Sequence, residues 1–360
     1  MKLVITIPAL VIVVASTLAA SQDTPQPESR RDLHYSIAVI DDATLYSGIQ
    51  VPLPKLLNQV LVEPSFDLRY KPQWSFSTSL VGVADRYTDK YTQFRVKESY
   101  AGLSAGDFDF TLGRRIVRWG TGYAFTAAGV LDPPRIPTNP TDRLNLNEGR
   151  DMIKADYVHG PHALTVAWSS AALAPASANL RDTTAFRYNV LVHGFDTSLI
   201  AGDDRGGDAF GGLTFTRVLG EAWEIHGEAA WREHEAILFG AKYTTPSGIT
   251  FIGEFFSPPN IPYFQDVTLY PLAGRQHYAF IRVGKSRLRE LPHWKQWDLN
   301  VSAVANLNDR SYTAIVDATR RFGNHFSSYL HIEIPTGSSK SEYGATPYAS
   351  ATSVGIRFQL

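Results

Sequence analysis

Short segments in which apolar and polar residues strictly alternate are the feature that most constrains the fold of this chain. The last nine residues, TSVGIRFQL, place Val354, Ile356 and Phe358 on one side of an extended chain, and Gly355 and Arg357 on the other. Similar segments of about ten residues, such as EAWEIHGEAAW and QWDLNVSAVAN, recur between Gly, Pro, Asn and Asp turns. Because successive side chains of a strand point to opposite faces, each segment has one apolar and one polar face. The pattern predicts an all-β protein.

Two architectures bury such segments differently. A soluble sandwich packs its apolar faces together, whereas a membrane barrel turns them to lipid and encloses a wet lumen. Trp223 and Trp231 are eight positions apart on one apolar face, which is about 27 Å of strand. At a tilt of about 40° this spans about 20 Å across the membrane, close to the separation of the aromatic girdles of outer-membrane barrels. A buried sandwich face gives no reason for an indole at both ends, so the spacing favours the barrel.

The lengths of the connections give a second signal. The long connections fall at 119–149, 171–184, 258–275 and 336–349, and all of them join strands at the same end. Outer-membrane barrels have short turns at the periplasmic rim and longer loops at the external rim. Counting from ATLYSGIQV at residues 43–51, we expect a closed antiparallel transmembrane β-barrel of about 18 strands, with 16 as the alternative count.

The N-terminus has the layout of an export signal. Lys2 precedes an apolar run from Leu3 to Val14, and small residues follow near Ala20. An uncleaved anchor is the alternative, but the run is shorter than the roughly 20 residues that a spanning helix needs. We therefore expect a cleaved signal peptide at 1–20, a periplasmic segment at 21–42, a barrel at 43–360 and a location in the outer membrane.

Composition and motifs narrow the classes of function. The chain has no cysteine, which excludes disulfides and a lipid-modified cysteine, and its formal net charge of -1 gives no reason to expect a nucleic-acid partner. We find no phosphate loop, dinucleotide fingerprint, G-x-S-x-G elbow or zinc spacing. We expect no cofactor, no metal and no enzymatic activity. An outer-membrane enzyme acting on lipid or polysaccharide and a secreted β-sandwich binding module stay as alternatives.

The longest connection, 119–149, carries four prolines, Pro133, Pro134, Pro137 and Pro140. Loops of this length are usually functional, and proline stiffens them. In general porins such a loop folds inward and narrows the pore; the alternative is a loop that lies across the rim. If the loop folds inward, the residues expected at the constriction are Trp119, Asp132, Arg135, Asp142 and Arg143.

The alternation also predicts which charged side chains line the pore. The basic set is Arg95, Lys97, Arg115, Lys154, Arg187 and Arg357, and the acidic set is Glu224, Glu228, Glu254, Asp298, Asp317 and Glu333. The basic residues lie on early strands and the last one, whereas the acidic residues lie on later strands. Opposed walls of opposite charge would give a transverse field across the channel. The alternative is local cross-strand pairing, at roughly a few tenths of a kcal/mol for each pair.

Two segments resemble known outer-membrane proteins. The stretch 113–157, with GRRIVRWG, the proline-rich loop and a GRD…Y strand, resembles a loose group of Gram-negative barrels that includes the alginate-export-like porins. This resemblance implies a diffusion or export channel. TSVGIRFQL is similar to the C-terminal assembly signal of such proteins, with Leu360 in the place of the usual terminal aromatic residue, and implies the barrel assembly machinery as a partner.

We therefore predict a porin-like outer-membrane channel for passive diffusion of small hydrophilic solutes. Its expected partners are the lipid bilayer and those solutes. The loop at 119–149 and the lumen charges would set its selectivity. The sequence leaves the substrate, the pore diameter and the oligomeric state open.

Overall fold

A computed structural model describes most of the chain beyond residue 30. The described ranges are 31–50, 54–70, 73–85, 92–133, 135–139, 143–144, 146–170, 173, 182–204, 208–232, 235–258, 276–287 and 296–360. The predicted signal peptide at 1–20 and the predicted constriction residue Asp142 lie outside these ranges.

Strands dominate the described residues. In chain order they are β1 (Arg31–Ser47), β2 (Leu56–Tyr70), β3 (Trp74–Asp85), β4 (Thr92–Ala105), β5 (Phe108–Arg115), β6 (Arg150–His159), β7 (His162–Ser169), β8 (Thr183–Val192), β9 (Phe195–Asp204), β10 (Asp208–Leu219), β11 (Trp223–Trp231), β12 (Glu235–Thr244), β13 (Ile249–Ser257), β14 (Tyr278–Lys285), β15 (Trp297–Asn306), β16 (Ser311–Phe322), β17 (Phe326–Thr336) and β18 (Ser350–Gln359). None of the described residues forms a helix long and apolar enough to cross a membrane.

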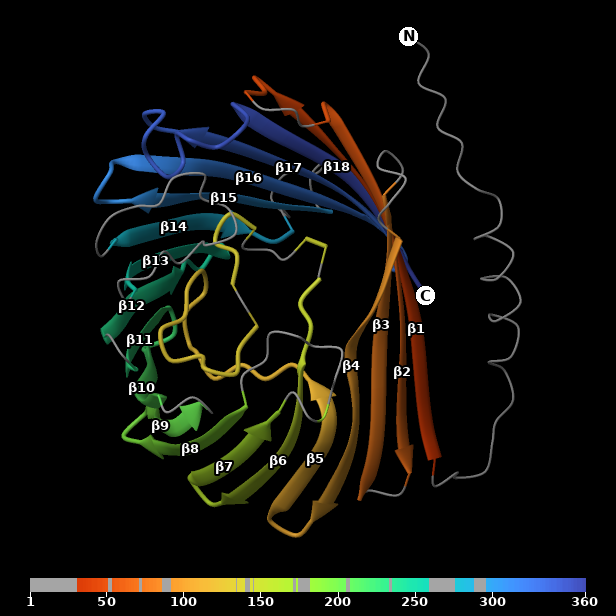
Figure 1. Ribbon diagram of the computed structural model, residues 1–360, viewed down its shortest axis with the longest axis vertical. Coiled ribbons are helices and arrows are strands. Elements are labelled where there is room, and N and C mark those ends of the chain that lie inside the picture. The colour runs from red at the N-terminus through yellow and green to blue at the C-terminus, as the bar shows by residue number, and fades with distance from the viewer. Residues whose placement is uncertain are drawn as a thin grey trace.

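The strands form one closed sheet. Each strand pairs antiparallel with the next, and β1 also pairs with β18, from Ala38 opposite Gln359 to Ser47 opposite Ser350 (Figure 1). Closure leaves no unpaired sheet edge, as a membrane-spanning sheet requires. The predicted 18-strand closed antiparallel barrel is confirmed, and the alternative count of 16 is wrong. TSVGIRFQL is part of the strand that closes the barrel.

The first strand begins earlier than the sequence suggested. β1 starts at Arg31, where Arg31 pairs with Tyr70, whereas the predicted barrel boundary was residue 43. Two adjacent acidic residues interrupt the apolar alternation and concealed this part of the strand. Asp42 is nevertheless buried on the lumenal side, where it accepts hydrogen bonds from the hydroxyls of Thr44 (3.1 Å) and Tyr329 (2.7 Å).

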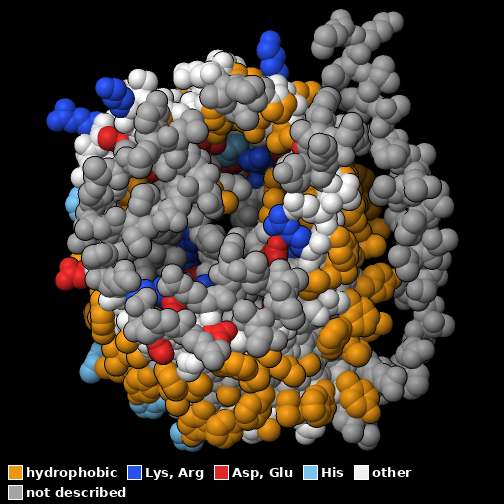
Figure 2. Space-filling model, viewed as in Figure 1, with side chains coloured by type: hydrophobic (Ala, Val, Ile, Leu, Met, Phe, Trp, Pro, Cys, Tyr) orange, Lys and Arg blue, Asp and Glu red, His pale blue; other side chains and the backbone are white. Residues whose placement is uncertain are grey.

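The two faces of the wall differ as the alternation predicts. On β12, Leu238 is 1% exposed and lies on the lumenal side, whereas its neighbours Ile237 and Phe239 are exposed on the outside. Trp223 and Trp231 are 50% and 59% exposed at opposite ends of β11. Apolar side chains gather over the outer surface, while charged side chains occupy the central hollow (Figure 2). An outer surface with so much contiguous apolar area requires an apolar surrounding.

The two rims of the barrel have different connections. At one rim, short turns such as 106–107, 160–161 and 193–194 join an even-numbered strand to the next odd-numbered strand. The first residue of β1 and the last residue of β18 lie at this same rim. Gly106 and Gly160 adopt positive φ angles of 61° and 57° in these turns, a conformation that favours glycine. The connections 116–149, 170–182, 258–277 and 337–349 all join strand ends at the opposite rim.

A β-bulge changes the alternation in β4. The register with β3 shifts between Ser79 and Leu80, so Lys97 is an additional residue in β4. Lys97 donates a hydrogen bond to Glu63 at 2.6 Å, and the adjacent Glu98 accepts one from the backbone N–H of Ile116 at 2.8 Å. Two consecutive side chains therefore point to the lumen, because a bulge reverses the face of the residues beyond it.

Candidate functional site

The connection between β5 and β6, residues 116–149, lies inside the barrel. We call it the lumenal loop. It leaves the end of β5, crosses the hollow enclosed by the strands and returns to β6 (Figure 1). Backbone contacts fix its two ends, since Ile116 donates to the Glu98 carboxylate and the N–H of Gly149 donates to the carbonyl of Lys97 at 2.8 Å.

Glu228 of β11 binds the backbone of this loop. Its Oε1 accepts hydrogen bonds from the N–H groups of Thr121 (2.5 Å) and Gly122 (2.8 Å). Its Oε2 accepts from the N–H groups of Ala127 (2.7 Å) and Ala128 (2.8 Å). The side chain is buried at 3% exposure. One carboxylate thus joins the start and the end of an eight-residue segment, Thr121 to Ala128.

Glu254 of β13 binds the middle of the same segment. Its Oε2 accepts from the N–H groups of Ala124 (2.8 Å) and Phe125 (3.4 Å), and its Oε1 accepts from the N–H of Tyr123. His226 lies beside it, with Nε2 at 3.0 Å from Oε1. The side chain of Glu254 is fully buried. Buried irregular backbone needs partners for its N–H groups, and hydrogen bonds to an ionised acceptor are among the strongest available.

Glycine allows the loop to approach these carboxylates closely. A Cβ on Gly122 would lie 2.7 Å from the Leu238 side chain and 2.4 Å from the carbonyl of Phe125. A Cβ on Gly120 would lie 2.1 Å from the hydroxyl of Thr126. The small, uncharged sequence GTGYAFTAAG from Gly120 to Gly129 therefore fits a backbone that folds tightly around two buried acids.

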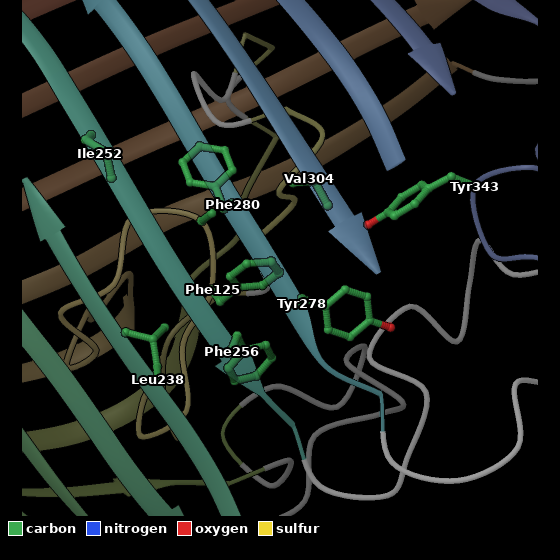
Figure 3. Close-up of a cluster of buried hydrophobic side chains, with 9 residues drawn as sticks. Phe125, Leu238, Ile252, Phe256, Tyr278, Phe280, Val304 and Tyr343 are labelled. Atoms are coloured by element: carbon green, nitrogen blue, oxygen red, sulfur yellow. The ribbon is translucent and has the colours of Figure 1, made fainter. Parts of the chain in front are cut away.

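Apolar contacts attach the loop at two further places. Phe125 stacks on Phe256 of β13, with ring centroids 4.9 Å apart. The cluster around it, shown in Figure 3, contains Ala124, Phe125, Leu238, Ile252, Phe256, Tyr278, Phe280, Val304 and Tyr343. A second cluster contains Trp119, Ala128, Leu131, Ala167, Ala185, Ile200 and Phe210. The lumenal face of β7–β10 and β12–β15 is therefore apolar where the loop covers it.

The far part of the loop contacts the opposite side of the barrel. Leu144 and Leu146 pack against the buried cluster Ile40, Leu61 and Val81 on β1–β3. Arg143 forms an ion pair with Asp42 of β1 at 3.3 Å, and its guanidinium lies 5.9 Å from the ring centre of Tyr329. The described parts of the loop therefore extend across the lumen from β11–β13 to β1 and β17.

Within the loop, three predicted constriction residues come together. Asp132 accepts hydrogen bonds from the N–H groups of Trp119 (2.6 Å) and Gly120 (3.2 Å) and lies 3.6 Å from Arg135. Arg135 in turn donates to the carbonyl of Gly120 at 3.0 Å. Burial raises the pKa of Asp132, while the N–H of Trp119 and the charge of Arg135 act in the opposite direction. Arg143 is separate from this group.

A second connection, 337–349, also reaches the lumen, and the sequence did not single it out. Tyr343 is buried in the cluster around Phe125 (Figure 3). The Oε2 of Glu342 accepts hydrogen bonds from Tyr278 (2.9 Å) and Asn306 (2.7 Å). Burial raises the pKa of Glu342. The two connections therefore meet on the same wall.

The predicted acidic residues all have partners. Beyond Glu228 and Glu254, Glu224 accepts from the hydroxyl of Tyr123 at 2.8 Å and Asp317 lies 2.7 Å from His331. Asp298 pairs with Arg321 at 2.5 Å, and Glu333 bonds the hydroxyl of Tyr348. Each of the six predicted acidic residues is thus in contact with another group of the protein.

Of the predicted basic residues, three have carboxylate partners. Arg95 pairs with Glu148 at 3.0 Å, Lys97 with Glu63 and Lys154 with Asp156. Arg115 instead donates to the hydroxyl of Thr111 at 2.9 Å and Arg187 to that of Ser198 at 2.9 Å. Arg357 lies opposite Ser327 and Ile40 in the sheet. Within the described residues, no carboxylate lies at ion-pair distance from Arg115, Arg187 or Arg357.

A polar cavity of about 1250 Å³ opens beside Arg115 and Lys154. Its lining carries charges of both signs, with Asp109 and Asp156 beside these two cations, and also includes Tyr100. The guanidinium of Arg115 lies over the ring of Tyr100 at 4.7 Å. The described residues hold no group of three or more His, Asp or Glu side chains arranged to bind a metal ion.

Sequence reasoning missed the lumenal residues Tyr123 and Glu98. The hydroxyl of Tyr123 lies 3.2 Å from Lys242 beside Glu224. Glu98 was missed because the bulge at Lys97 changes the face of the residues that follow. Apolar residues on both faces of ITFIGEFF, at Ile249–Phe256, were the available signal that something covers the lumenal side of β13.

Comparison with known proteins identifies the architecture. No family model and no curated protein matches the chain. Among solved structures, OpdK from Pseudomonas aeruginosa with vanillate has a TM-score of 0.63 at 8% identity, covering 91% of this chain and 98% of that one. OccD3 (OpdP) from the same organism has a TM-score of 0.61 at 8% identity, covering 91% of both chains. A mutant of the Rh. blastica porin has a TM-score of 0.53 at 9% identity, covering 91% and 100%. The chain therefore has the fold of a porin-type β-barrel.

Proposed function

We propose that this chain is an outer-membrane channel through which small hydrophilic solutes diffuse passively. The observations that carry the proposal are the lumenal loop, which is bound at several points across a closed barrel, and a polar, charged cavity lined mainly by residues of β1–β6. An apolar exterior and a polar interior are what such a channel needs. The rim with short turns would face the periplasm, and the rim with long connections would face outward.

We further propose that the lumenal cations without an ion-pair partner set a preference for anionic solutes. The acids of the opposite wall contact loop backbone, histidine, hydroxyl or cationic groups, whereas Arg115 and Arg187 donate to hydroxyls and have no carboxylate at ion-pair distance among the described residues. A ring or wall of one charge in a narrow passage attracts the opposite charge and repels its own. The loop would bring solutes close enough to the wall for this charge to act.

The test is recording of single channels in planar lipid bilayers. We expect stepwise conductance, and under a salt gradient a reversal potential of the sign that anion preference gives. A panel of chloride, acetate, potassium, vanillate and glucose would rank the solutes; vanillate is included because the similar OpdK structure contains it. Protein that folds as a heat-modifiable barrel but never conducts would contradict the proposal.

A further inference from the structure

We infer that Glu228 and Glu254 are positioning residues, which hold the lumenal loop against β11–β13 and thereby set the width of the passage. The inference rests on the proposed channel function and adds to it the part of the wall that fixes the constriction. Neither carboxylate is free to contact a passing solute, because both are buried under the loop. Their effect on transport would come through the loop alone.

The two acids accept hydrogen bonds from different parts of the segment Thr121–Ala128. Glu228 binds the N–H groups at both ends of Thr121–Ala128, and Glu254 binds the three in the middle. Thr126 is the one residue of this segment whose N–H is not included, and its hydroxyl donates to Glu228 at 3.0 Å instead. Every residue of the segment is therefore bound to one of the two carboxylates.

Only a carboxylate satisfies this arrangement. An ionised carboxylate accepts through both oxygens, whereas a glutamine amide of the same size presents one oxygen and one NH₂ donor. In Glu228→Gln, the NH₂ group would face N–H donors at one of the two positions that the oxygens now occupy. Two loop N–H groups would lose their acceptor, and an unpaired buried donor is unfavourable. The loop would then leave the wall more often.

The same carboxylates are not needed for the barrel wall itself. Glu228 pairs through its backbone with Thr214 and Leu238, and Glu254 pairs with Gly240 and Phe280. These ladders do not involve the carboxylate groups. The variants Glu228→Gln and Glu254→Gln should therefore form barrels with unchanged heat-modifiable migration.

The structure also offers a way to attach the loop without the acids. A Cβ built on Gly212 of β10 would lie 3.2 Å from the Cβ of Ala128. Disulfides have Cβ–Cβ distances of about 3.8 Å, so a small shift of the loop would accommodate one. The chain has no cysteine of its own. Ala128→Cys with Gly212→Cys would therefore form a single defined bridge from the loop to the wall.

The experiment compares single-channel conductance of the wild type, Glu228→Gln, Glu254→Gln and the double variant. Asp317→Asn is the matched control, since Asp317 is a buried lumenal acid of β16 that contacts His331 and, among the described residues, no part of the loop. We expect the double variant to conduct about twice as much as the wild type or to switch between levels, and the control to stay near the wild-type value.

The disulfide supplies the decisive readout. In the double variant that also carries Ala128→Cys and Gly212→Cys, oxidation should restore the wild-type conductance and reduction should abolish the rescue. A merely structural role of the two acids would not respond to the bridge. If the double variant fails to fold, the same comparison is made on Glu228→Gln with the bridge, because Glu228 is the acid that binds Ala128.

The outcomes separate the two proposals. A wild-type barrel without conductance contradicts the channel function. A conducting wild type whose Glu228→Gln and Glu254→Gln variants keep its conductance, noise and ion selectivity leaves the channel function intact and overturns the positioning role.

Discussion

The acidic and the basic walls of the lumen start from the same sequence pattern and end with different surroundings. On β11 and β13, Glu228 and Glu254 are covered by the lumenal loop and bind its backbone. On β5 and β8, Arg115 and Arg187 donate hydrogen bonds to neighbouring hydroxyls, and Arg115 lines the polar cavity. Alternation decides which face of the sheet a charge lies on. The neighbours of that charge decide whether it binds other groups of the protein or interacts with permeating solutes.

The apolar side chains of the lumen also differ between the wall that the loop covers and the wall around the cavity. The covered wall presents Leu238, Phe256 and Phe280 to the lumen, where they pack against Phe125 (Figure 3). The wall around the cavity presents Tyr100, Lys154 and Asp156 instead. A lumenal surface can thus be identified as a docking surface for a loop when buried acids and apolar side chains occur on it together.

The largest expected effect comes from reversing the charge of the lumenal wall that the loop leaves uncovered, at Arg115 and Arg187. Arg115→Glu with Arg187→Glu replaces two cations by anions, so the reversal potential under a salt gradient should move toward cation preference and change sign. Arg115→Lys with Arg187→Lys is the control, because it changes the same positions and keeps both positive charges. An unchanged reversal potential in the double variant would show that these arginines do not act on the permeating ions.

A smaller effect is expected from disturbing the covered wall. In Gly122→Val, the new side chain would overlap Leu238 and the carbonyl of Phe125, so the loop should be displaced and the conductance should rise. Gly253→Ala on β13 is the control, because its Cβ would have no atom within 4 Å among the described neighbours. Bilayer recordings and the temperature of the heat-modifiable transition measure the two consequences. Equal behaviour of both variants would contradict tight docking of the loop.

The smallest effect concerns Asp132. Burial raises its pKa above the ordinary value of 3.8, so the docked loop binds this proton more readily than an undocked loop does. Protonation therefore favours docking as the pH falls through the raised pKa, and the ionised form opposes it at neutral pH. Asp132→Asn resembles the protonated form. The conductance of the two proteins should differ by less than about twofold at pH 7, and the difference should shrink as the pH falls through the raised pKa; a difference that stays constant with pH would refute the assignment.

Local signals predicted the barrel well. Strand periodicity and turn residues are encoded within about ten residues, which is why the strand count and the side of the long connections followed from the sequence. The position of the lumenal loop inside the barrel could not be predicted from such local signals. Glu228 is 100 residues from Ala128, and nothing in either local pattern connects them.

Local irregularities account for the remaining differences. The bulge at Lys97 reverses the face of Glu98, and Asp41 and Asp42 concealed residues 31–42 of β1. The connection 337–349 has no proline-rich signature comparable to that of the lumenal loop, yet Tyr343 joins the same cluster. The position of Tyr343 follows from its contacts with distant segments, which the local sequence does not show.

The most direct test of the account asks which faces meet water. Because the chain lacks cysteine, single cysteines can report on one position each. In protein reconstituted in lipid vesicles, a water-soluble maleimide should label Arg115→Cys in the lumen and leave Phe239→Cys on the outer surface unlabelled, while a lipid-soluble maleimide should label Phe239→Cys. Equal labelling of both positions by the water-soluble reagent would contradict a barrel with a lipid-facing exterior and a wet lumen.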